Sequence, residues 1–256
     1  MLVAFSGGAD SAFLLAAAVR HLGSENVAAA TAISASLPAT ELDLARDFAA
    51  SLGVRHLTPT TDEMSRDGYR ANGADRCFFC KAELLEVLTP LAASLGLDHV
   101  ATGTNADDAV AGFRPGIRAA AERGAVTPLL DAGLTKAEVR EISQAWGLVT
   151  WDKPAAACLS SRIAYGIEVS PYRLSRVERA ESALRAELAT AGLGVRDLRV
   201  RDVGDTARVE IDRDLVDAVA SRPELLDVVT GFDAVELDPR GFRSGAMNEA
   251  LVALPE

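Results

Sequence analysis

A glycine- and serine-rich segment near the N-terminus has the residue types of an anion-binding loop. It lies between a predicted buried strand over residues 2–5 and a predicted apolar helix over residues 12–21. Glycines let the backbone approach a ligand closely, and the N–H groups at the start of a helix favour negative charge. Two serine hydroxyl groups add further donors. We therefore expect a phosphate-binding loop made of Ser6, Gly7, Gly8, Asp10 and Ser11.

The aspartate of this loop predicts a metal ion. Because Asp10 would repel bare phosphate, its presence favours a Mg²⁺ ion that bridges the carboxylate and a nucleotide. The loop lacks the lysine of a Walker A motif and the G-x-G-x-x-G spacing of dinucleotide-binding folds. An ordinary glycine-rich turn between a strand and a helix is the structural alternative.

A second acidic segment follows a predicted strand over residues 99–102. Open parallel sheets bind ligands where their strands end, so this segment and the first loop are expected to share one site. Ser34, after a predicted strand over residues 27–33, lies on the same edge, where its loop would cover the adenine or form a simple turn. An Asx-rich helix cap is the alternative for the acidic segment. The residues assigned to the nucleotide are Gly103, Thr104, Asp107 and Asp108, with Asp107 as the expected second ligand of Mg²⁺.

The three cysteines, Cys77, Cys80 and Cys158, are candidates for one metal centre. Cys77 and Cys80 form a C-x-x-C motif immediately before a predicted helix over residues 81–95. The spacing alone is compatible with a redox disulfide, half of a zinc site, part of an iron–sulfur site, or unrelated thiols. Three thiolates would leave one iron of a [4Fe–4S] cluster without a protein ligand.

Short apolar runs alternate with helix-period stretches, and this pattern predicts the elements that position these residues. The N-terminal part is expected to be a Rossmann-like α/β domain with a parallel sheet. Thr135 and Glu138 predict a capping box at its last helix. The predicted strands cover residues 2–5, 27–33, 54–58 and 99–102, and the predicted helices cover residues 12–21, 41–52, 81–95 and 135–146.

A smaller C-terminal α/β domain is predicted to follow. Residues 151–170 have no clear period, which indicates a functional loop or linker. The pattern restarts with an amphipathic helix over residues 172–191 and strands over residues 198–203 and 207–211. The expected domains are residues 1–165 and 166–256.

Composition and charge exclude some partners. The chain has 256 residues and a formal net charge of −11, which argues against nucleic-acid binding because that relies on clustered Lys and Arg. Long apolar runs, such as residues 12–19, are too short to span a bilayer. The N-terminus has no signal-peptide pattern. We therefore expect a cytoplasmic protein with neither nucleic-acid nor membrane partners.

Together the motifs resemble the LarE family of sulfur transferases, which are PP-loop enzymes that cleave ATP between its α and β phosphates. Adenylating PP-loop enzymes in general share the first and third motifs, and the segment around Cys158 narrows the resemblance to LarE. Two features depart from the family: a short helix usually precedes the first strand, and an aspartate usually stands at Gly112. The matching segments are SGGADS (6–11), DRCFFCK (75–81), GTNADD (103–108), RPG (114–116), PLLDAGLTKAEVR (128–140), TWDKPAAACLSSRIAYG (150–166) and RVRDVGDTARVEI (199–211).

The resemblance implies ATP-dependent sulfur transfer to pyridinium-3,5-biscarboxylic acid mononucleotide, in nickel-pincer cofactor synthesis. A substrate carboxylate attacks the α-phosphorus of ATP, which gives an acyl-adenylate and pyrophosphate. A sulfur nucleophile then displaces AMP and leaves a thiocarboxylate, and two rounds give the bisthiocarboxylate. The expected domains become a PP-loop ATP pyrophosphatase domain and a substrate-binding and oligomerisation domain in a homo-oligomer, with ATP, Mg²⁺ and a sulfide donor as partners.

The number of cysteines distinguishes two sulfur sources within the family. Members with only the cysteine corresponding to Cys158 give up its sulfur and retain dehydroalanine, whereas members with three hold a [4Fe–4S] cluster that relays sulfide. Because this chain also has Cys77 and Cys80, we expect the cluster. A sacrificial Cys158 is the alternative.

The resemblance also assigns roles to charged residues of the C-terminal domain. Arg199 and Arg201 would bind the substrate phosphate, for which guanidinium groups are well suited. Glu210 and Glu181 match family carboxylates near the cysteine. From the bare pattern, two arginines on one strand are more often solvated, and surface ion pairs are an equal alternative for the glutamates.

Two other classes of function stay open. Another PP-loop enzyme, a tRNA thiolase or an amide-forming synthetase, would share the nucleotide motifs. A tRNA enzyme should show a basic face, however, and an amide-forming synthetase does not require three cysteines. A non-catalytic nucleotide-binding protein would need the glycine loop but neither the aspartates nor the thiols. Pyrophosphate release from ATP would separate an enzyme from a binding protein.

Overall fold

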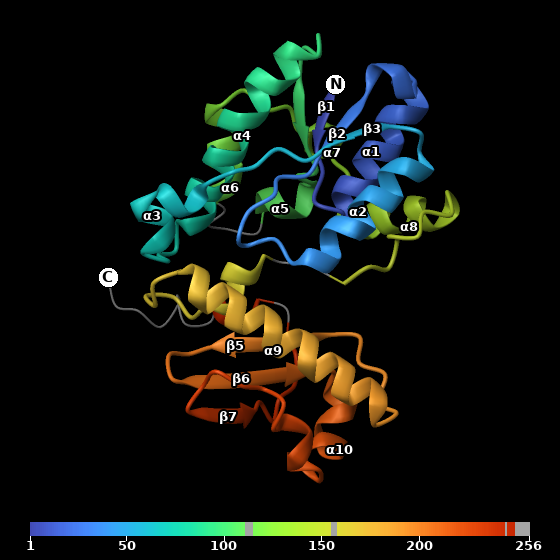
Figure 1. The fold of residues 1–256 in the computed structure, drawn as a ribbon. Helices are drawn as coiled ribbons and strands as arrows, with labels where there is room; N and C mark the ends of the chain where they lie inside the picture. Colours follow the sequence, from blue (N-terminus) through green and yellow to red (C-terminus); the bar gives the residue numbers. More distant parts are fainter. Residues whose placement is uncertain (111–114, 155–157, 244, 249–256) are drawn as a thin grey trace. The chain divides into compact units, whose positions relative to one another are not determined.

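The computed structural model describes residues 1–110, 115–154, 158–243 and 245–248 (Figure 1). The chain folds into two compact units. The N-terminal unit contains Met1–Tyr69 and Asp75–Ala156, and the C-terminal unit contains Arg70–Ala74 and Ala157–Glu256. The domain boundary expected near residue 165 stays a prediction. The sequence pattern did not indicate that Arg70–Ala74 belong to the C-terminal unit.

A four-stranded parallel sheet in the order β3-β2-β1-β4 forms the centre of the N-terminal unit. Its pairing confirms the predicted parallel α/β sheet, with Val3 of β1 opposite Ala29 of β2 and Ala101 of β4. The chain proceeds from β1 to β2 and β3, and β4 then pairs with the other edge of β1. A topological switch point therefore lies between β1 and β4. The strands are β1 (Leu2–Ala4), β2 (Ala28–Ala30), β3 (Arg55–Leu57) and β4 (Val100–Thr102).

Helices bury both faces of this sheet. Leu2 packs with residues of α4 and α6, whereas Val3 packs with residues of α1, α2 and α8. The two contacts differ because successive side chains of a strand point to opposite faces. Figure 1 shows the two helix layers on either side of the sheet. The helices are α1 (Ala9–Leu22), α2 (Ala39–Ser51), α3 (Asp67–Arg70), α4 (Arg76–Ser94), α5 (Ala106–Val110), α6 (Pro115–Glu122), α7 (Pro128–Asp131) and α8 (Lys136–Ala145).

Local signals set the start of two of these helices. α1 begins directly after Gly8, so the glycine loop leads straight into the helix. Thr135 and Glu138 form the predicted reciprocal capping box of α8. The structure therefore has the loop and the helix cap at the predicted residues.

α4 begins earlier than predicted, at Arg76, so both cysteines of the C-x-x-C motif lie within its first five residues rather than before it. The two phenylalanines between the cysteines contact residues outside α4. The Phe79 ring fills the space beside Gly68, where a Cβ would be 2.1 Å from a ring atom. The Arg118 guanidinium lies 4.7 Å from the centroid of the Phe78 ring. Such contacts stabilise a helical turn that the local pattern does not identify.

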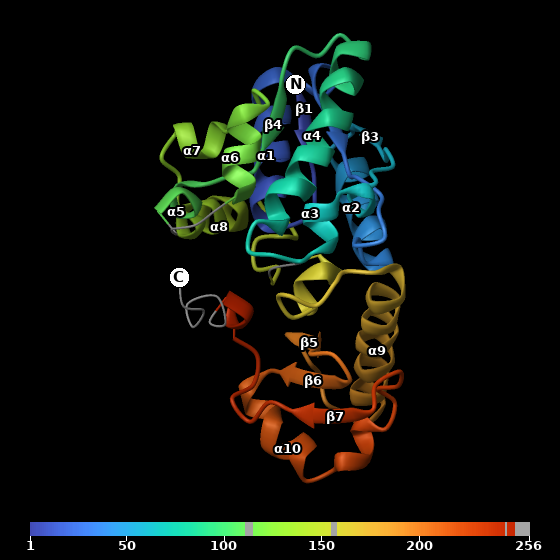
Figure 2. The same ribbon diagram turned by 90° about the vertical axis from the view of Figure 1, so that its left-hand side faces the viewer.

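A three-stranded sheet in the order β5-β6-β7 forms the C-terminal unit (Figure 2), with β5 and β6 antiparallel and β6 and β7 parallel. α9 packs on it through Leu184 and Leu188, which share one core with Val200 and Val209. The predicted helix and both predicted strands are present, and β7 adds a third strand. The elements are α9 (Pro171–Thr190), β5 (Leu198–Asp202), β6 (Thr206–Ile211), α10 (Val216–Ala220) and β7 (Ala234–Leu237).

Asn72 anchors the segment Arg70–Ala74 in the C-terminal unit. Its side chain is fully buried and donates to the carbonyl oxygens of Ala164 and Ile167, each at 2.9 Å. The backbone carbonyl of Asn72 accepts the Gly166 N–H at 3.2 Å. Its φ of +53° is left-handed, a conformation that asparagine tolerates better than most residues. The segment that precedes α4 is thus held by residues that follow Cys158 in the chain.

Short 3₁₀ turns complete the connections. One of them, Leu159–Arg162, directly follows Cys158 within the predicted functional loop. Of the helices in the described residues, none has the length and apolar character needed to cross a membrane. The other 3₁₀ turns are Ser24–Asn26, Glu63–Ser65, Arg213–Leu215, Pro223–Leu226 and Ala246–Asn248.

Candidate active site

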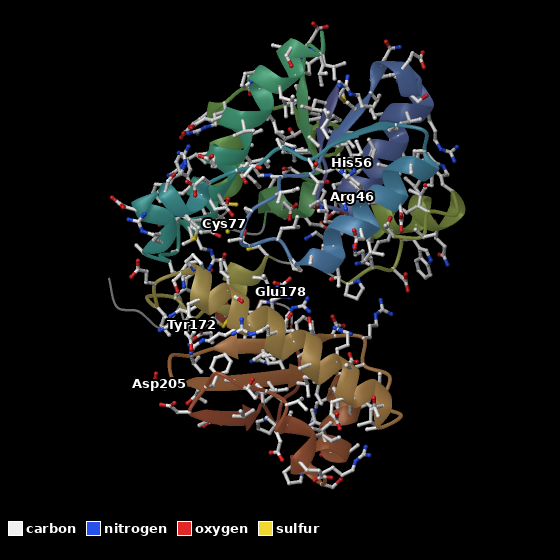
Figure 3. The ribbon with its side chains drawn as sticks, viewed as in Figure 1. Arg46, His56, Cys77, Tyr172, Glu178 and Asp205 are labelled. Carbon is white, nitrogen blue, oxygen red and sulfur yellow. The ribbon has the colours of Figure 1, made fainter. Side chains whose placement is uncertain are left out.

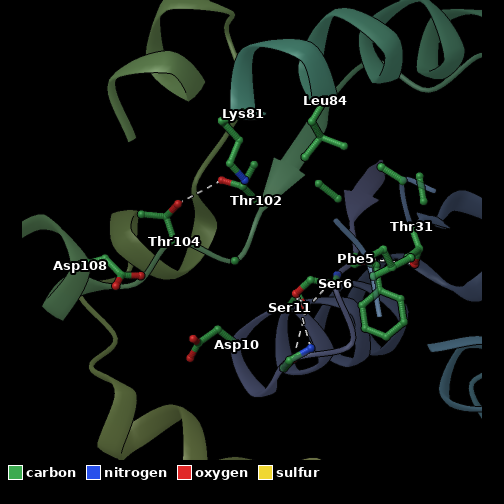
Figure 4. A pocket seen from close by; sticks show the side chains of 16 residues that line it. Phe5, Ser6, Asp10, Ser11, Thr31, Lys81, Leu84, Thr102, Thr104 and Asp108 are labelled. Carbon is green, nitrogen blue, oxygen red and sulfur yellow. Dashed lines mark hydrogen bonds between the residues drawn. The ribbon is translucent and has the colours of Figure 1, made fainter. Parts of the chain in front are cut away.

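A pocket of about 350 Å³ lies at the switch point between β1 and β4 (Figure 4). Its walls come from the ends of β1, β2 and β4, the first turn of α1, and α4. Parallel α/β sheets bind ligands at this edge, and the volume is within the range of small-molecule sites. The predicted nucleotide-site residues that line it are Ser6, Gly8, Asp10, Ser11, Gly103, Thr104 and Asp108.

The phosphate loop turns at Gly7, whose φ is +72°. Glycine adopts this left-handed conformation without steric cost. The hydroxyl groups of Ser6 and Ser11 lie 3.2 Å apart, and the Ser11 hydroxyl donates to the Gly8 carbonyl at 3.1 Å. The loop therefore presents both hydroxyls to the pocket together with the positive end of α1.

Two carboxylates, those of Asp10 and Asp108, line the pocket. Burial raises the pKa of Asp10; the charge of Lys136 opposes this shift and the charge of Asp108 adds to it. Lys136 also forms an ion pair with Asp108 at 3.2 Å. Carboxylate oxygens are ligands that Mg²⁺ takes in proteins, so the ligand type fits, and magnesium binding here stays a prediction.

Asp107 faces a different partner. Its Oδ2 accepts the backbone N–H of Lys136 at 2.8 Å, at the start of α8. The Asp108 N–H donates to Oδ1 of the buried Asn105 at 3.1 Å, so the alternative of an Asx cap also holds for this segment. Magnesium binding by Asp107 stays a prediction, and Asp108 is the carboxylate that shares the pocket with Asp10.

The Ser34 hydroxyl contacts a neighbouring polar group, and Ser34 is not among the residues that line the pocket. Its hydroxyl lies 3.0 Å from that of Ser36, which donates to Glu63 at 2.7 Å. Farther along the same loop, Leu37 lines the pocket beside Thr31. The loop after β2 thus supplies an apolar wall, and adenine contact by Ser34 itself stays a prediction.

Lys81 is a pocket residue that was not assigned from the sequence. It reaches the pocket from α4, and Figure 4 shows its side chain beside the strand that leads to Thr104. Burial lowers the pKa of Lys81, while the charges of the two C-x-x-C cysteines and of Asp108 act in the opposite direction. Its place directly after C-x-x-C was the one signal that pointed to it.

Cys77 and Cys80 stand three residues apart at the start of α4 and therefore lie on one face of the helix. Cys77 is exposed, Cys80 is half-buried, and no disulfide joins cysteines in the described part of the chain. Figure 3 marks Cys77 near the start of α4. Two thiols on one helical face suit a metal centre that takes two of its ligands from this motif.

Cys158 belongs to the C-terminal unit, and two polar side chains there hydrogen-bond to its backbone. Its carbonyl oxygen accepts the Ser161 hydroxyl at 2.7 Å and the Arg162 guanidinium at 3.1 Å. Arg162 is only 4% exposed and forms a bidentate ion pair with Glu181 of α9, at 2.9 and 3.1 Å. Glu181 thus reaches Cys158 through Arg162, a residue that was not assigned from the sequence.

A buried arginine pair lies on one face of β5. Arg201 pairs with Glu210 at 2.8 and 3.0 Å and donates to the Ser161 carbonyl at 3.1 Å. Arg199 and Arg201 are 8% and 6% exposed, so the interpretation of solvated arginines is wrong. Burial, together with the charge of Arg162, lowers the pKa of Arg199 to about 10. A bound anion would stabilise such a cluster.

No protein-family model matches the chain. An uncharacterized protein of Synechocystis is 42% identical over 98% of this chain and 92% of its own length. The pyridinium-3,5-bisthiocarboxylic acid mononucleotide synthase of Lactiplantibacillus plantarum is 35% identical over 97% of this chain and 89% of its own length. This chain belongs to the LarE family. A second uncharacterized protein, from Methanocaldococcus jannaschii, is 31% identical over 60% of the chain.

In this LarE chain the cysteines are divided between the units, with Cys77 and Cys80 in one and Cys158 in the other. Within the described residues, no group of three or more His, Cys, Asp or Glu side chains is placed to hold a metal ion. Thiolates are the ligands that iron–sulfur clusters take in proteins, so the donor type of the three cysteines fits such a cluster. The cluster itself stays a prediction. Residues 155–157, which belong to the LarE segment around Cys158, lie outside the described residues, as do Gly112 and Arg114.

Proposed function

We propose that the protein is an ATP-dependent sulfur transferase that converts the carboxylates of pyridinium-3,5-biscarboxylic acid mononucleotide to thiocarboxylates for the nickel-pincer cofactor. The observation that carries the proposal is the pocket at the β1–β4 switch point, where the phosphate loop meets the Asp10–Asp108 pair. It occurs in a chain that is 35% identical, over 97% of its length, to a synthase of the corresponding bisthiocarboxylic acid mononucleotide.

The first step is adenylation of the substrate in this pocket. A substrate carboxylate oxygen attacks the α-phosphorus of ATP, the bond from that phosphorus to the β-phosphate oxygen breaks, and pyrophosphate leaves. The Gly8 N–H and the serine hydroxyls bind phosphate. Asp10 and Asp108 would hold Mg²⁺, which when bound supplies positive charge to the phosphates. The Lys81 ammonium offsets the negative charge that builds up on the α-phosphate.

The arginine cluster supports binding of the substrate phosphate in the C-terminal unit. Arg199 and Arg162 raise the local positive charge, and burial keeps it away from water. Arg201 forms an ion pair with Glu210 at 2.8 Å. Guanidinium groups suit a phosphate, and Arg199 is the second arginine on the same face of β5. Glu181 holds Arg162 and thereby the carbonyl of Cys158.

The second step is transfer of sulfur to the acyl carbon, with release of AMP. Cys77, Cys80 and Cys158 would hold a [4Fe–4S] cluster, which when bound supplies an iron that can carry sulfide to the acyl-adenylate. The alternative in the same reaction is that Cys158 gives up its own sulfur. In either case the substrate carbon loses its bond to the adenylate oxygen and gains one to sulfur.

The test is product analysis under anaerobic conditions with ATP, Mg²⁺, the biscarboxylic acid mononucleotide and sulfide. We expect AMP and pyrophosphate by chromatography and thiocarboxylate products by mass spectrometry. ADP and phosphate as the nucleotide products would overturn the proposal. A parallel reaction with bulk tRNA in place of the mononucleotide should release no pyrophosphate; release only with tRNA would favour a tRNA thiolase instead.

A further inference from the structure

Lys153 connects parts of the N-terminal unit that are far apart in the sequence. Its ammonium donates to the carbonyl oxygen of Gly7 in the phosphate loop at 3.0 Å and to Oε2 of Glu41 on α2 at 2.7 Å. The Lys153 and Glu41 side chains are 15% and 19% exposed. The pair is therefore largely shielded from solvent, which strengthens the attraction between the two charges.

The backbone of Lys153 is held by separate contacts. Arg140 on α8 donates to the carbonyl oxygens of Lys153 at 2.9 Å and Trp151 at 3.2 Å. The Lys153 N–H donates to the Thr150 carbonyl at 3.1 Å. The ammonium thus reaches the phosphate loop from a fixed piece of backbone.

The contact with Lys153 sets the orientation of the peptide between Gly7 and Gly8. The C=O and N–H of a trans peptide point in opposite directions, so a Gly7 carbonyl turned toward Lys153 turns the Gly8 N–H away from it. Gly8 lines the pocket, and its N–H donates to the hydroxyl of Ser6, another lining residue, at 3.4 Å. The N–H is therefore on the pocket side, where an anion can accept it.

We propose that Lys153 is a positioning residue of the phosphate loop. By holding the Gly7 carbonyl it presents the Gly8 N–H to a phosphate group, and Glu41 keeps the ammonium on the carbonyl and off the phosphate. Without this contact the Gly7–Gly8 peptide is free to rotate, because glycine has access to many conformations, and the loop would turn a carbonyl oxygen toward the anion. The role differs from that of a Walker A lysine, which contacts phosphate itself. It rests on the proposed use of ATP.

The experiment measures affinity for ATP and for adenosine by calorimetry and NMR in four variants of the full chain. Lys153→Met keeps the length of the side chain and removes its donors. We expect it to weaken ATP binding by about tenfold or more, the factor implied by the loss of one hydrogen bond to a charged group, and to leave adenosine binding within about twofold of wild type. Lys153→Arg, which can donate to both partners, should restore most of the affinity for ATP. Glu41→Gln should weaken ATP binding by a smaller factor.

Asp43→Asn is the matched control, because it removes a charge from the same helix at an exposed residue whose ion-pair partner is Arg46. Unchanged ATP affinity in folded Lys153→Met would overturn the inference, as would equal losses for ATP and adenosine. If Lys153→Met does not fold, ATP affinity in Glu41→Gln equal to that of Asp43→Asn would overturn it. Failure of the wild-type protein to bind ATP would contradict the proposed function instead, so the two failures are distinguishable.

Discussion

Gly103 lies so close to Ser11 that a Cβ on Gly103 would be 2.9 Å from the Ser11 backbone nitrogen and 3.0 Å from its Cα. These are main-chain atoms at the start of α1 and cannot move aside as the end of a flexible side chain can. Only glycine therefore lets the loop after β4 rest on the first turn of α1. This approach brings the segment that carries Asp108 to the pocket wall opposite the phosphate loop.

Gly103→Ala should destabilise the protein and weaken ATP binding together. The added methyl group must push the β4 loop away from α1, and overpacking of this kind costs about 1–3 kcal/mol of unfolding free energy. Urea unfolding and calorimetric titration with ATP measure the two effects. Gly194→Ala is the control, since nothing lies within 4 Å of its Cβ position. Equal stability and ATP affinity in the two variants would contradict the close approach.

Asp10→Asn should abolish pyrophosphate release while the protein stays folded. The amide keeps the size of the side chain but lacks the charge that holds Mg²⁺ against phosphate. Because burial raises the pKa of Asp10, loss of its charge should not lower the unfolding free energy. Pyrophosphate assays and thermal unfolding check both points. Asp107→Asn is the comparison that decides between the adjacent aspartates: we expect it to retain more activity than Asp108→Asn.

Arg199→Gln should weaken binding of the pyridinium mononucleotide more than binding of ATP. A hydrogen bond between charged groups contributes about 1.5–3 kcal/mol, which corresponds to a loss of affinity of about tenfold or more. Titrations with each ligand measure the difference. Arg185→Gln serves as a control, because Arg185 is an α9 residue whose guanidinium makes an exposed hydrogen bond to the Val195 carbonyl. Equal effects on the two ligands would remove Arg199 from the substrate site.

The mass of the protein after turnover distinguishes the two possible sources of sulfur. With sulfide supplied and a cluster held by Cys77, Cys80 and Cys158, the enzyme should turn over repeatedly and keep its intact mass. Protein purified without oxygen should also contain iron and acid-labile sulfide and absorb visible light, and Cys77→Ala should lose all three signals. A mass lower by one H₂S, with dehydroalanine at Cys158, would show a single-use donor instead.

His56 should make stability depend on pH below neutrality. Its Nε2 lies 2.8 Å from the hydroxyl of Thr31, which donates to the Phe5 carbonyl at 2.7 Å. Burial and the charge of Arg46 lower the pKa of His56 below its ordinary value of 6.5; Figure 3 marks both residues. The unfolded chain therefore takes up this proton at a higher pH than the folded one, and stability present at neutral pH is lost as pH falls below the unfolded pKa.

The expected slope from this one group is up to about 1.4 kcal/mol of unfolding free energy per pH unit. Urea unfolding between about pH 8 and about pH 5.5 measures it, and subtracting the profile of His56→Gln removes the other groups. Identical profiles for wild type and variant would show that His56 does not carry the dependence.

Short-range patterns determined much of the nucleotide half of the protein. The loop from Ser6 to Ser11 could be placed because a buried strand, two glycines and a helix follow one another directly in the chain. The capping box of Thr135 and Glu138 spans three residues and was equally accessible. The resemblance of the motifs identified the LarE family before any geometry was known, and the relationship to a named synthase supports it.

Only the tertiary structure decided which side chains meet. Asp107 and Asp108 are neighbours in sequence, but successive residues on a helix point about 100° apart. Asp108 therefore lines the pocket, whereas Asp107 accepts the backbone N–H of Lys136 at the start of α8. The start of α4 and the burial of Arg199 depend likewise on partners outside the local pattern. Lys153 and Gly7 are 146 positions apart, and Asn72 and Ala164 are 92 apart. A local pattern shows which residues share a helix face or a strand face, and it carries no information about which distant element will cover that face.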